Sequence, residues 1–223
     1  MTRMILYKEW LKTRWILLGI LVVTAAITSY CLLNLGKVAE IRGNDIIWIT
    51  LLTKDTVLTD ILQYLPMIAG IVLGVSQFLP EISRKRLKLT LHLPFPQWKM
   101  IALMVLYGLM ALTLTFTLQA VALSVVFRRW VAAELVTRII LTMLPWYLAG
   151  WAAYLWTTAI CLEPAWKLRT VLAIIGAGLL RLLFLTPVPE AYNCFLPALA
   201  VYTCCGALLI GHGIIRFKEG IQD

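Results

Sequence analysis

Six long apolar segments divide this chain, and they limit its fold more than any other feature of the sequence. A helix needs roughly 20 apolar residues to cross a bilayer, because each residue rises about 1.5 Å and the hydrocarbon core is about 30 Å thick. The six segments lie at residues 15–35, 61–79, 100–127, 139–162, 168–185 and 195–215. We therefore predict an all-α integral membrane protein with about six transmembrane helices.

The composition agrees with lipid as the solvent. Of the 223 residues, 61% are hydrophobic and 14% are charged, whereas a soluble domain has about half apolar and about a quarter charged residues. The net charge is +9, but the basic residues lie in short segments between the apolar runs. That pattern is typical of residues that fix membrane orientation, so we expect membrane lipid, and not nucleic acid, as a partner.

The distribution of basic residues predicts the orientation. Cytoplasmic segments of membrane proteins carry an excess of Lys and Arg. With the N-terminus inside, thirteen bases fall in inside segments and six in outside segments, while Arg181 lies within a span. We predict a multi-pass protein of the cytoplasmic (inner) membrane with both termini in the cytoplasm.

Segment 1–14 has the pattern of an amphipathic helix. Its apolar side chains recur every three to four residues, at Met4, Tyr7, Leu11 and Trp15. Its polar side is basic, with Lys8, Lys12 and Arg14. Such a helix can lie in the plane of the headgroups. We predict an interfacial helix before the first span; the alternative is a plain cytoplasmic continuation of that span.

Segment 80–99 joins the second and third predicted spans on the predicted cytoplasmic side. An acidic residue, Glu81, stands near its start, and a basic group follows at Arg84, Lys85, Arg86 and Lys88. Alternate leucines come next, at Leu87, Leu89, Leu91 and Leu93, before Pro94 and Lys99. A basic, partly apolar element of this length can rest against the membrane and still offer a surface to another protein. The alternative is a basic loop that serves orientation alone.

In this order of features the chain resembles the permeases of type-2 ATP-binding-cassette (ABC) transporters. That family has an interfacial N-terminal helix and six spans, and its loop after the second span contains a coupling helix that docks on the ATPase subunit. The resemblance implies one transmembrane permease domain over residues 1–223. It also implies ATPase-coupling residues at Glu81, Arg84, Lys85, Arg86, Leu87, Lys88 and Leu91. One departure is that many members have Gly-Thr soon after the acidic residue, where this chain has Lys85 and Arg86.

The resemblance implies an exporter permease that works with other subunits. Its partners would be a separate ABC ATPase subunit and a second permease subunit, in a homodimer or a heterodimer. The sequence has no G-x-x-x-x-G-K-[ST], H-E-x-x-H or G-x-S-x-G motif, so we expect a transporter subunit without catalytic residues or a metal site of its own. ATP and Mg²⁺ are expected on the partner ATPase.

Polar residues within the predicted spans are candidates for a substrate path. They are Arg181, Gln77, Thr117 and Gln119. An ionisable group in a span needs a partner, a wet cavity or a route to the surface, so Arg181 either lines a path or snorkels. A threonine in a span can equally bond back to its own helix. Gly70 and Gly74 form a G-x-x-x-G, which permits close approach of helices.

Two further classes of function stay open at the level of sequence. One is a carrier outside the ABC class, or an immunity protein that shields its host without transport. The other is an integral membrane enzyme, which would need paired acidic or histidine groups near an interface. Glu81, His92, Glu163 and Glu190 are too scattered along the sequence to favour that class. The substrate stays unidentified.

Overall fold

A computed structural model of the chain describes residues 2–42, 62–83, 97–129, 133–186, 188 and 191–219. Six α-helices account for most of them: α1 (Thr2–Arg42), α3 (Leu65–Ser83), α5 (Gln97–Phe127), α6 (Ala133–Leu162), α7 (Trp166–Arg181) and α8 (Leu196–Glu219). Two short 3₁₀ segments, η2 (Leu182–Phe184) and η3 (Asn193–Phe195), lie between α7 and α8. Within these ranges there is no strand, and the predicted all-α fold is confirmed.

Four of the helices are long and apolar enough to cross a membrane. The stretches are Thr2–Asn34, Leu65–Ile82, Trp98–Phe127 and Ala133–Leu162. The α7 helix has 16 residues, and the apolar part of the last helical region is Asn193–Leu208. The six helices follow the six predicted segments in order, and the four long ones are compatible with a multi-pass membrane protein.

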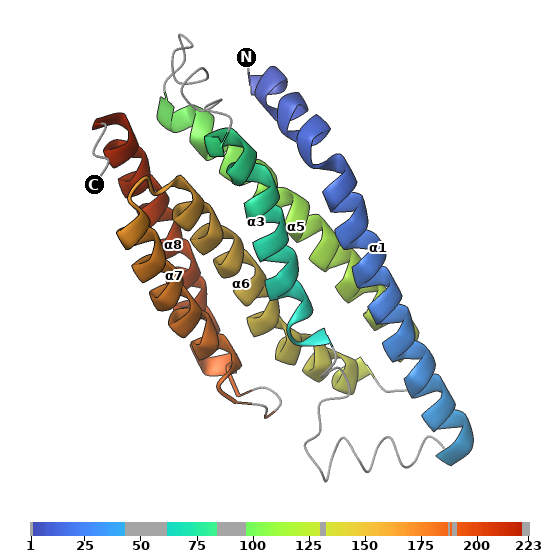
Figure 1. Cartoon of the computed structure of the whole chain (residues 1–223). Helices are drawn as coiled ribbons and strands as arrows, with labels where there is room; N and C mark the ends of the chain where they lie inside the picture. Colours follow the sequence, from blue (N-terminus) through green and yellow to red (C-terminus); the bar gives the residue numbers. More distant parts are fainter. Residues whose placement is uncertain are drawn as a thin grey trace.

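The helices run alternately up and down in one bundle (Figure 1). The start of α1 lies at the same end of the bundle as the last turns of α8, and we name this end the N-terminal end. Because the direction alternates, α3 ends there and α5 begins there.

The α6 helix is the centre of the bundle, with α3 and α5 on one side and α7 and α8 on the other. Of its apolar stretch, 72% is buried inside the protein, against 22% for α1. The contact with α3 is close because glycines face each other. A Cβ on Gly70 would collide with the carbonyl oxygen of Gly150, and one on Gly74 would lie 3.0 Å from Thr157 Cβ. The close approach predicted from Gly70 and Gly74 is thus confirmed as packing within this chain.

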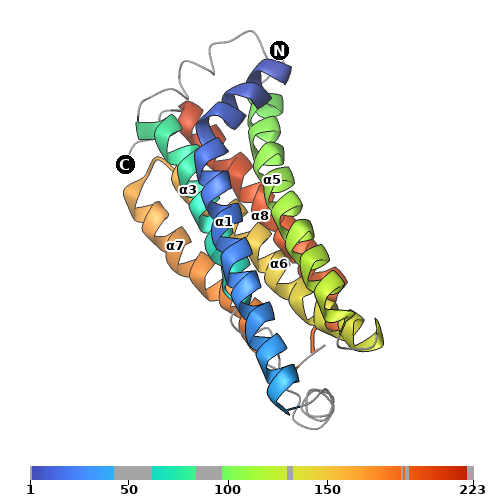
Figure 2. The same ribbon diagram turned by 90° about the vertical axis from the view of Figure 1, so that its right-hand side faces the viewer.

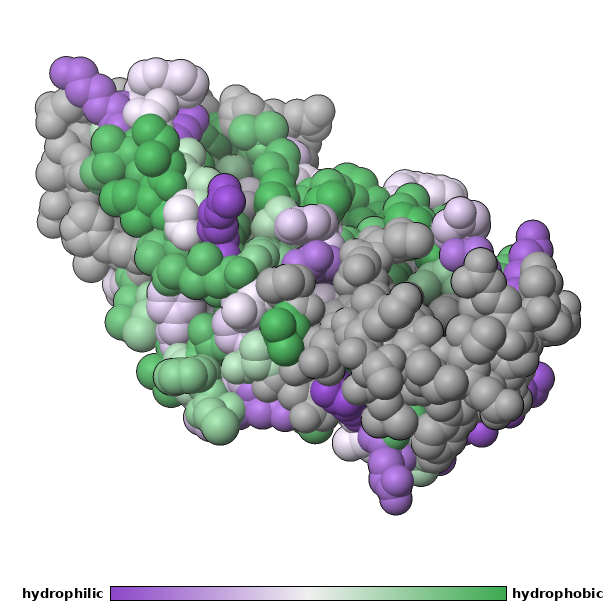
Figure 3. Space-filling model, turned by 90° about the horizontal axis from the view of Figure 1, so that it is seen from below, coloured by the Kyte–Doolittle hydropathy of each residue, from purple (hydrophilic) through white to green (hydrophobic). Residues whose placement is uncertain are grey.

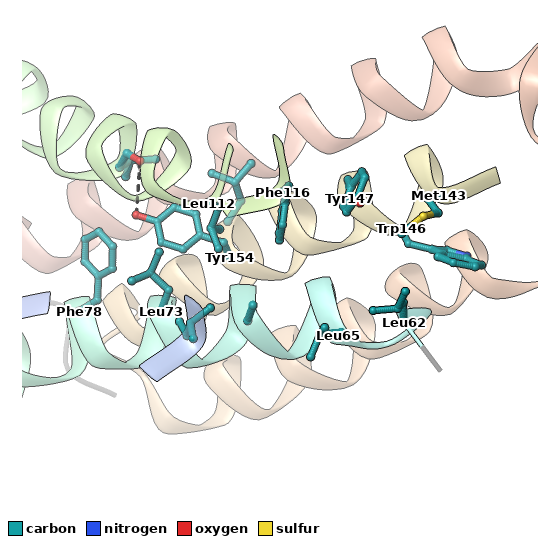
Figure 4. Close-up of a cluster of buried hydrophobic side chains, with 14 of the residues drawn as sticks. Leu62, Leu65, Leu73, Phe78, Leu112, Phe116, Met143, Trp146, Tyr147 and Tyr154 are labelled. Carbon is teal, nitrogen blue, oxygen red and sulfur yellow. Dashed lines mark hydrogen bonds between the residues drawn. The ribbon is translucent and has the colours of Figure 1, made fainter. Parts of the chain in front are cut away.

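Large side chains fill the space between α3, α5 and α6. Figure 4 shows Phe78 from α3 and Leu112 and Phe116 from α5 beside Tyr154 and Tyr147 from α6. The rings of Phe116 and Tyr147 stack with their centroids 5.2 Å apart. The core therefore belongs mainly to three of the long helices.

The outer surface is apolar as well. Hydrophobic side chains spread over the face seen from the end opposite the N-terminal end (Figure 3). Exposed examples along the lengths of the helices are Leu33, Met110, Leu114, Val121, Ile174, Val201 and Leu208. In water such a surface would drive aggregation, whereas lipid covers it without cost.

The α1 helix combines segment 1–14 with the first predicted span. It continues without a break from Thr2 to Arg42. Its first turns lean away from the direction of the rest (Figure 2). The amphipathic pattern is inverted relative to a soluble protein: Met4 and Trp15 are 76% and 70% exposed, while Glu9 and Thr13 are fully buried. A helix continuous with a span still turns its apolar stripe outward to lipid.

Candidate functional site

A cluster of charged side chains lies near the N-terminal end of the bundle. It contains Lys8, Glu9 and Lys12 of α1 and Glu81 of α3, and we name these residues the charged cluster. The sequence predicts Glu81 in a loop, but α3 continues through Pro80 to Ser83. Glu81 therefore sits in the last turn of α3, held by helical backbone, just before residues 84–96.

Two lysines of α1 converge on one oxygen of Glu81. Lys8 Nζ lies 3.0 Å and Lys12 Nζ 2.9 Å from Glu81 Oε1. The two lysines are four residues apart, so they stand one above the other on the same side of the helix. Each ion pair joins α1 to α3 directly.

Lys12 also pairs within α1. Its Nζ lies 2.9 Å from Glu9 Oε2 and donates a hydrogen bond of 3.1 Å to Glu9 Oε1. Lys12 thus stands between two carboxylates, and its side chain is only 14% exposed. Two acids and two lysines make the charged cluster neutral overall, which is what a site removed from water requires.

Gln77 extends the charged cluster to α5 and α6. Its Nε2 donates to Glu9 Oε2 at 3.0 Å and to the backbone carbonyl of Met104 in α5 at 2.8 Å. Its Oε1 accepts a 2.8 Å bond from the hydroxyl of Tyr154 in α6. Gln77 and Tyr154 are fully buried. Both N–H groups of the glutamine amide and one lone pair of its Oε1 are therefore hydrogen-bonded inside the protein.

A second link joins α1 to α5 beside the charged cluster. The hydroxyls of Thr13 and Tyr107 lie 2.9 Å apart, and Thr13 Oγ1 donates to the Glu9 carbonyl at 2.8 Å. Tyr154 crosses the bundle here because Gly108 of α5 leaves room for its ring; a Cβ at Gly108 would collide with the tyrosine hydroxyl. The four longest apolar helices are therefore connected through polar groups at one level.

The charged cluster keeps one unmet acceptor. Glu81 Oε2 is buried without a hydrogen-bond partner among the described residues. Breaking a buried ion pair leaves an uncompensated charge and costs about 3–5 kcal/mol. The ion pairs therefore oppose any displacement of α1 relative to α3 that would leave one of these charges without a partner.

The predicted substrate-path residues do not share one site. Gln77 belongs to the network described above. Gln119 is buried on α5, where its Nε2 donates to Thr28 Oγ1 of α1 at 3.3 Å and its Oε1 has no partner within the described ranges. Thr117 Oγ1 donates a hydrogen bond of 2.9 Å to the Leu114 carbonyl of its own helix, which is the alternative to a place in a substrate path.

Arg181 is the last residue of α7 and is exposed. Its position at the end of the helix opposite the N-terminal end agrees with the snorkelling alternative. Among the residues that the structure describes, no ion pair is formed with it.

The remaining predicted coupling residues, Arg84, Lys85, Arg86, Leu87, Lys88 and Leu91, lie outside the described residues. Their neighbours on both sides are placed. Glu81 precedes them in α3, and Trp98 and Lys99, both exposed, follow in the first turn of α5 at the same end of the bundle.

Sequence reasoning missed Glu9, Tyr107 and Tyr154. Glu9 and Thr13 are four residues apart and stand between the apolar positions of segment 1–14. An acidic residue beside two lysines at the start of an apolar run is a usable signal for a buried pair. Tyr154 carries no such signal, because a tyrosine in an apolar segment can equally face the lipid interface.

The connection between α7 and α8 has a small polar contact of its own. The hydroxyl of Tyr192 accepts hydrogen bonds from the amides of Leu185 and Thr186, at 2.9 and 3.2 Å, and donates to the Leu182 carbonyl at 3.1 Å. A cavity of about 10 Å³ between this connection and α6 has room for one water molecule.

Comparison of this chain with protein-family models, with curated proteins and with solved structures finds no match. A search of the described residues for three or more His, Cys, Asp or Glu side chains that could hold a metal ion finds no such group. The fold and the charged cluster are therefore the features of this chain that bear on its function.

Proposed function

We propose that this chain is the membrane-spanning permease subunit of an ABC exporter, driven by a separate ATPase subunit and paired with a second permease subunit. ATP and Mg²⁺ act on the ATPase. The permease crosses the cytoplasmic membrane with both termini in the cytoplasm, and the N-terminal end of the bundle is its cytoplasmic end.

One observation carries the proposal: the ion pairs of Lys8 and Lys12 with Glu81. Glu81 stands in the last turn of α3, three residues before the basic segment that begins at Arg84. A force applied to that segment by a docked ATPase reaches α3 through a rigid helical backbone. The ion pairs then pass it to α1, which forms no other ion pair with α3 among the described residues.

The same end of the bundle offers a route to α6. Gln77 lies four residues before Glu81, one turn along the same side of α3, and accepts the hydrogen bond of Tyr154. The close glycine contact between α3 and α6 makes those two helices move together, since their backbones touch. A displacement of α3 is thus shared by the central helix and by α1, as a permease that converts ATPase closure into outward opening requires.

The test is binding and stimulation of a partner ABC ATPase, to be sought in the reading frames next to that of this chain. Charge reversal of Arg84, Lys85 and Arg86 to Glu should weaken co-purification by about tenfold, equal to about 1.4 kcal/mol. The loss should be larger at low salt than at high salt, because salt screens exposed charges. Introducing charge at Leu87 and Leu91 should abolish stimulation, since buried apolar anchors dominate such contacts.

The matched control reverses Arg128 and Arg129, which are exposed at the opposite end of the bundle. That variant should bind and stimulate the ATPase normally. Cysteine labelling must first show that each variant keeps its orientation, because basic residues also fix topology. A correctly inserted loop variant that binds and stimulates the ATPase like the unaltered chain would remove the exporter proposal.

A further inference from the structure

The first four turns of α1 present a cationic and aromatic surface on the side away from the bundle. Arg3, Tyr7, Trp10 and Arg14 follow one another at spacings of four, three and four residues, so they form one stripe along the helix. All four are exposed, with Tyr7 at 63% and Trp10 at 51%. The buried side of the same turns holds Glu9 and Thr13.

The charge on this surface has one sign. Glu9 is the single acidic residue among residues 2–39 of the sequence, and it is fully buried against Lys12 and Gln77. Because the acid faces inward and the arginines face outward, the stripe offers positive charge without a competing carboxylate of its own segment. Lys8, 38% exposed, adds part of its charge at the edge.

Aromatic and apolar groups lie directly beside the arginines. The guanidinium of Arg14 stands over the ring of Trp15, 5.4 Å from its centroid. Met4 and Leu11, 76% and 43% exposed, continue the apolar side next to the stripe. Cationic groups bordered by Trp, Tyr and aliphatic side chains match the boundary between phospholipid headgroups and acyl chains.

The length of the following segment sets the depth of the stripe. Residues 15–36 contain no charged side chain, and at about 1.5 Å per residue they extend about 33 Å, close to the thickness of the hydrocarbon core. Arg14 therefore lies at the level of the headgroups when that segment crosses the membrane. Arg3 lies about 16 Å further along the helix, and because the first turns of α1 lean away from the direction of the rest (Figure 2), it stays closer to that layer than a straight helix would place it.

We propose that the stripe Arg3, Tyr7, Trp10 and Arg14 binds anionic phospholipids, with the guanidinium groups on the phosphates and the rings at the acyl boundary. A planar guanidinium matches two phosphate oxygens at once, which favours arginine for this role. The site does not depend on the ATPase, so it stands or falls separately from the proposed function.

The test measures lipid preference on the full-length purified chain. The chain is reconstituted in phosphatidylcholine vesicles, and spin-labelled phosphatidylglycerol and spin-labelled phosphatidylcholine report the motionally restricted lipid at its surface. The unaltered chain should prefer phosphatidylglycerol. R3Q/R14Q should lower that preference by at least about twofold, and added salt should lower it in the unaltered chain. R3K/R14K keeps the charge and should retain most of the preference.

The matched control is R128Q/R129Q, which removes two exposed arginines at the opposite end of the bundle. The proposal is overturned if R3Q/R14Q keeps the full preference, or if R128Q/R129Q lowers it equally, because general charge would then explain the selectivity. Should the double variant fail to reconstitute, R14Q alone must show a smaller decrease in the same direction, and an unchanged preference in R14Q contradicts the proposal.

Discussion

The four long helices and the pair α7–α8 are attached to the bundle by different kinds of contact. In the first region, α1, α3, α5 and α6 share ion pairs and hydrogen bonds around the charged cluster, and α3 touches α6 at backbone level. In the second, α7 has a single buried residue, Gly176, which packs on Trp156 of α6. Ion pairs and side-chain hydrogen bonds between helices thus fix relative position in the first region. The second region has fewer constraints of this kind, among them the hydrogen bond that Arg169 Nη2 donates to the Glu163 carbonyl at 2.7 Å.

The largest difference between the two regions should come from a single methyl group. Gly70→Ala should destabilise the protein by about 3 kcal/mol, because its Cβ would meet the backbone of Gly150, which has no rotamer with which to move away. Gly178→Ala is the control in α7, where a Cβ meets nothing within 4 Å. It should be neutral or slightly stabilising, since alanine favours helix. The free energy of unfolding in mixed micelles measures both, and equal losses would contradict the comparison.

Much of the fold follows from local sequence. The six apolar segments, the close approach of Gly70 and the back-bonded Thr117 all depend on spacing along one helix, which the sequence contains. The continuity of α1 through Trp15 does not, because segment 1–14 and the following span each satisfy their own pattern.

Only part of the charged cluster can be predicted from the sequence, for the same reason. Glu81, Gln77, Lys8 and Lys12 are conspicuous as polar residues beside apolar runs, but their pairing depends on which sides of α1 and α3 face each other. In a membrane protein the buried side of a helix is not the more hydrophobic side, since lipid accepts apolar groups as readily as the core does. The more hydrophobic side of a helix can therefore face the lipid as well as the core, as Met4 and Trp15 show.

A smaller effect should sharpen the comparison within the α7–α8 region. Tyr192→Phe removes a hydroxyl that serves three backbone groups, and it should cost about 1 kcal/mol because the contact is exposed. Hydrogen exchange at the amides of Leu185 and Thr186 should become faster, while the amides around Gln77 keep their protection. Tyr30→Phe, an exposed tyrosine of α1, is the control and should change neither. Faster exchange in α3 after Tyr192→Phe would mean that the two regions are not separately held.

The most direct test of the link between α1 and α3 is a double-mutant cycle on Lys12 and Glu81. Lys12→Met, Glu81→Gln and the double variant are compared by their free energies of unfolding in mixed micelles. We expect a coupling of about 1 kcal/mol or more, because each single change leaves the charged cluster with a net charge, whereas the double variant is neutral again. The control pairs Lys12→Met with Gln119→Leu, whose partner Thr28 lies four turns further along α1, and these effects should add. If Lys12 and Glu81 also add, within about 0.5 kcal/mol, the ion pair does not join the two helices, and the proposed route from the loop to α1 is wrong.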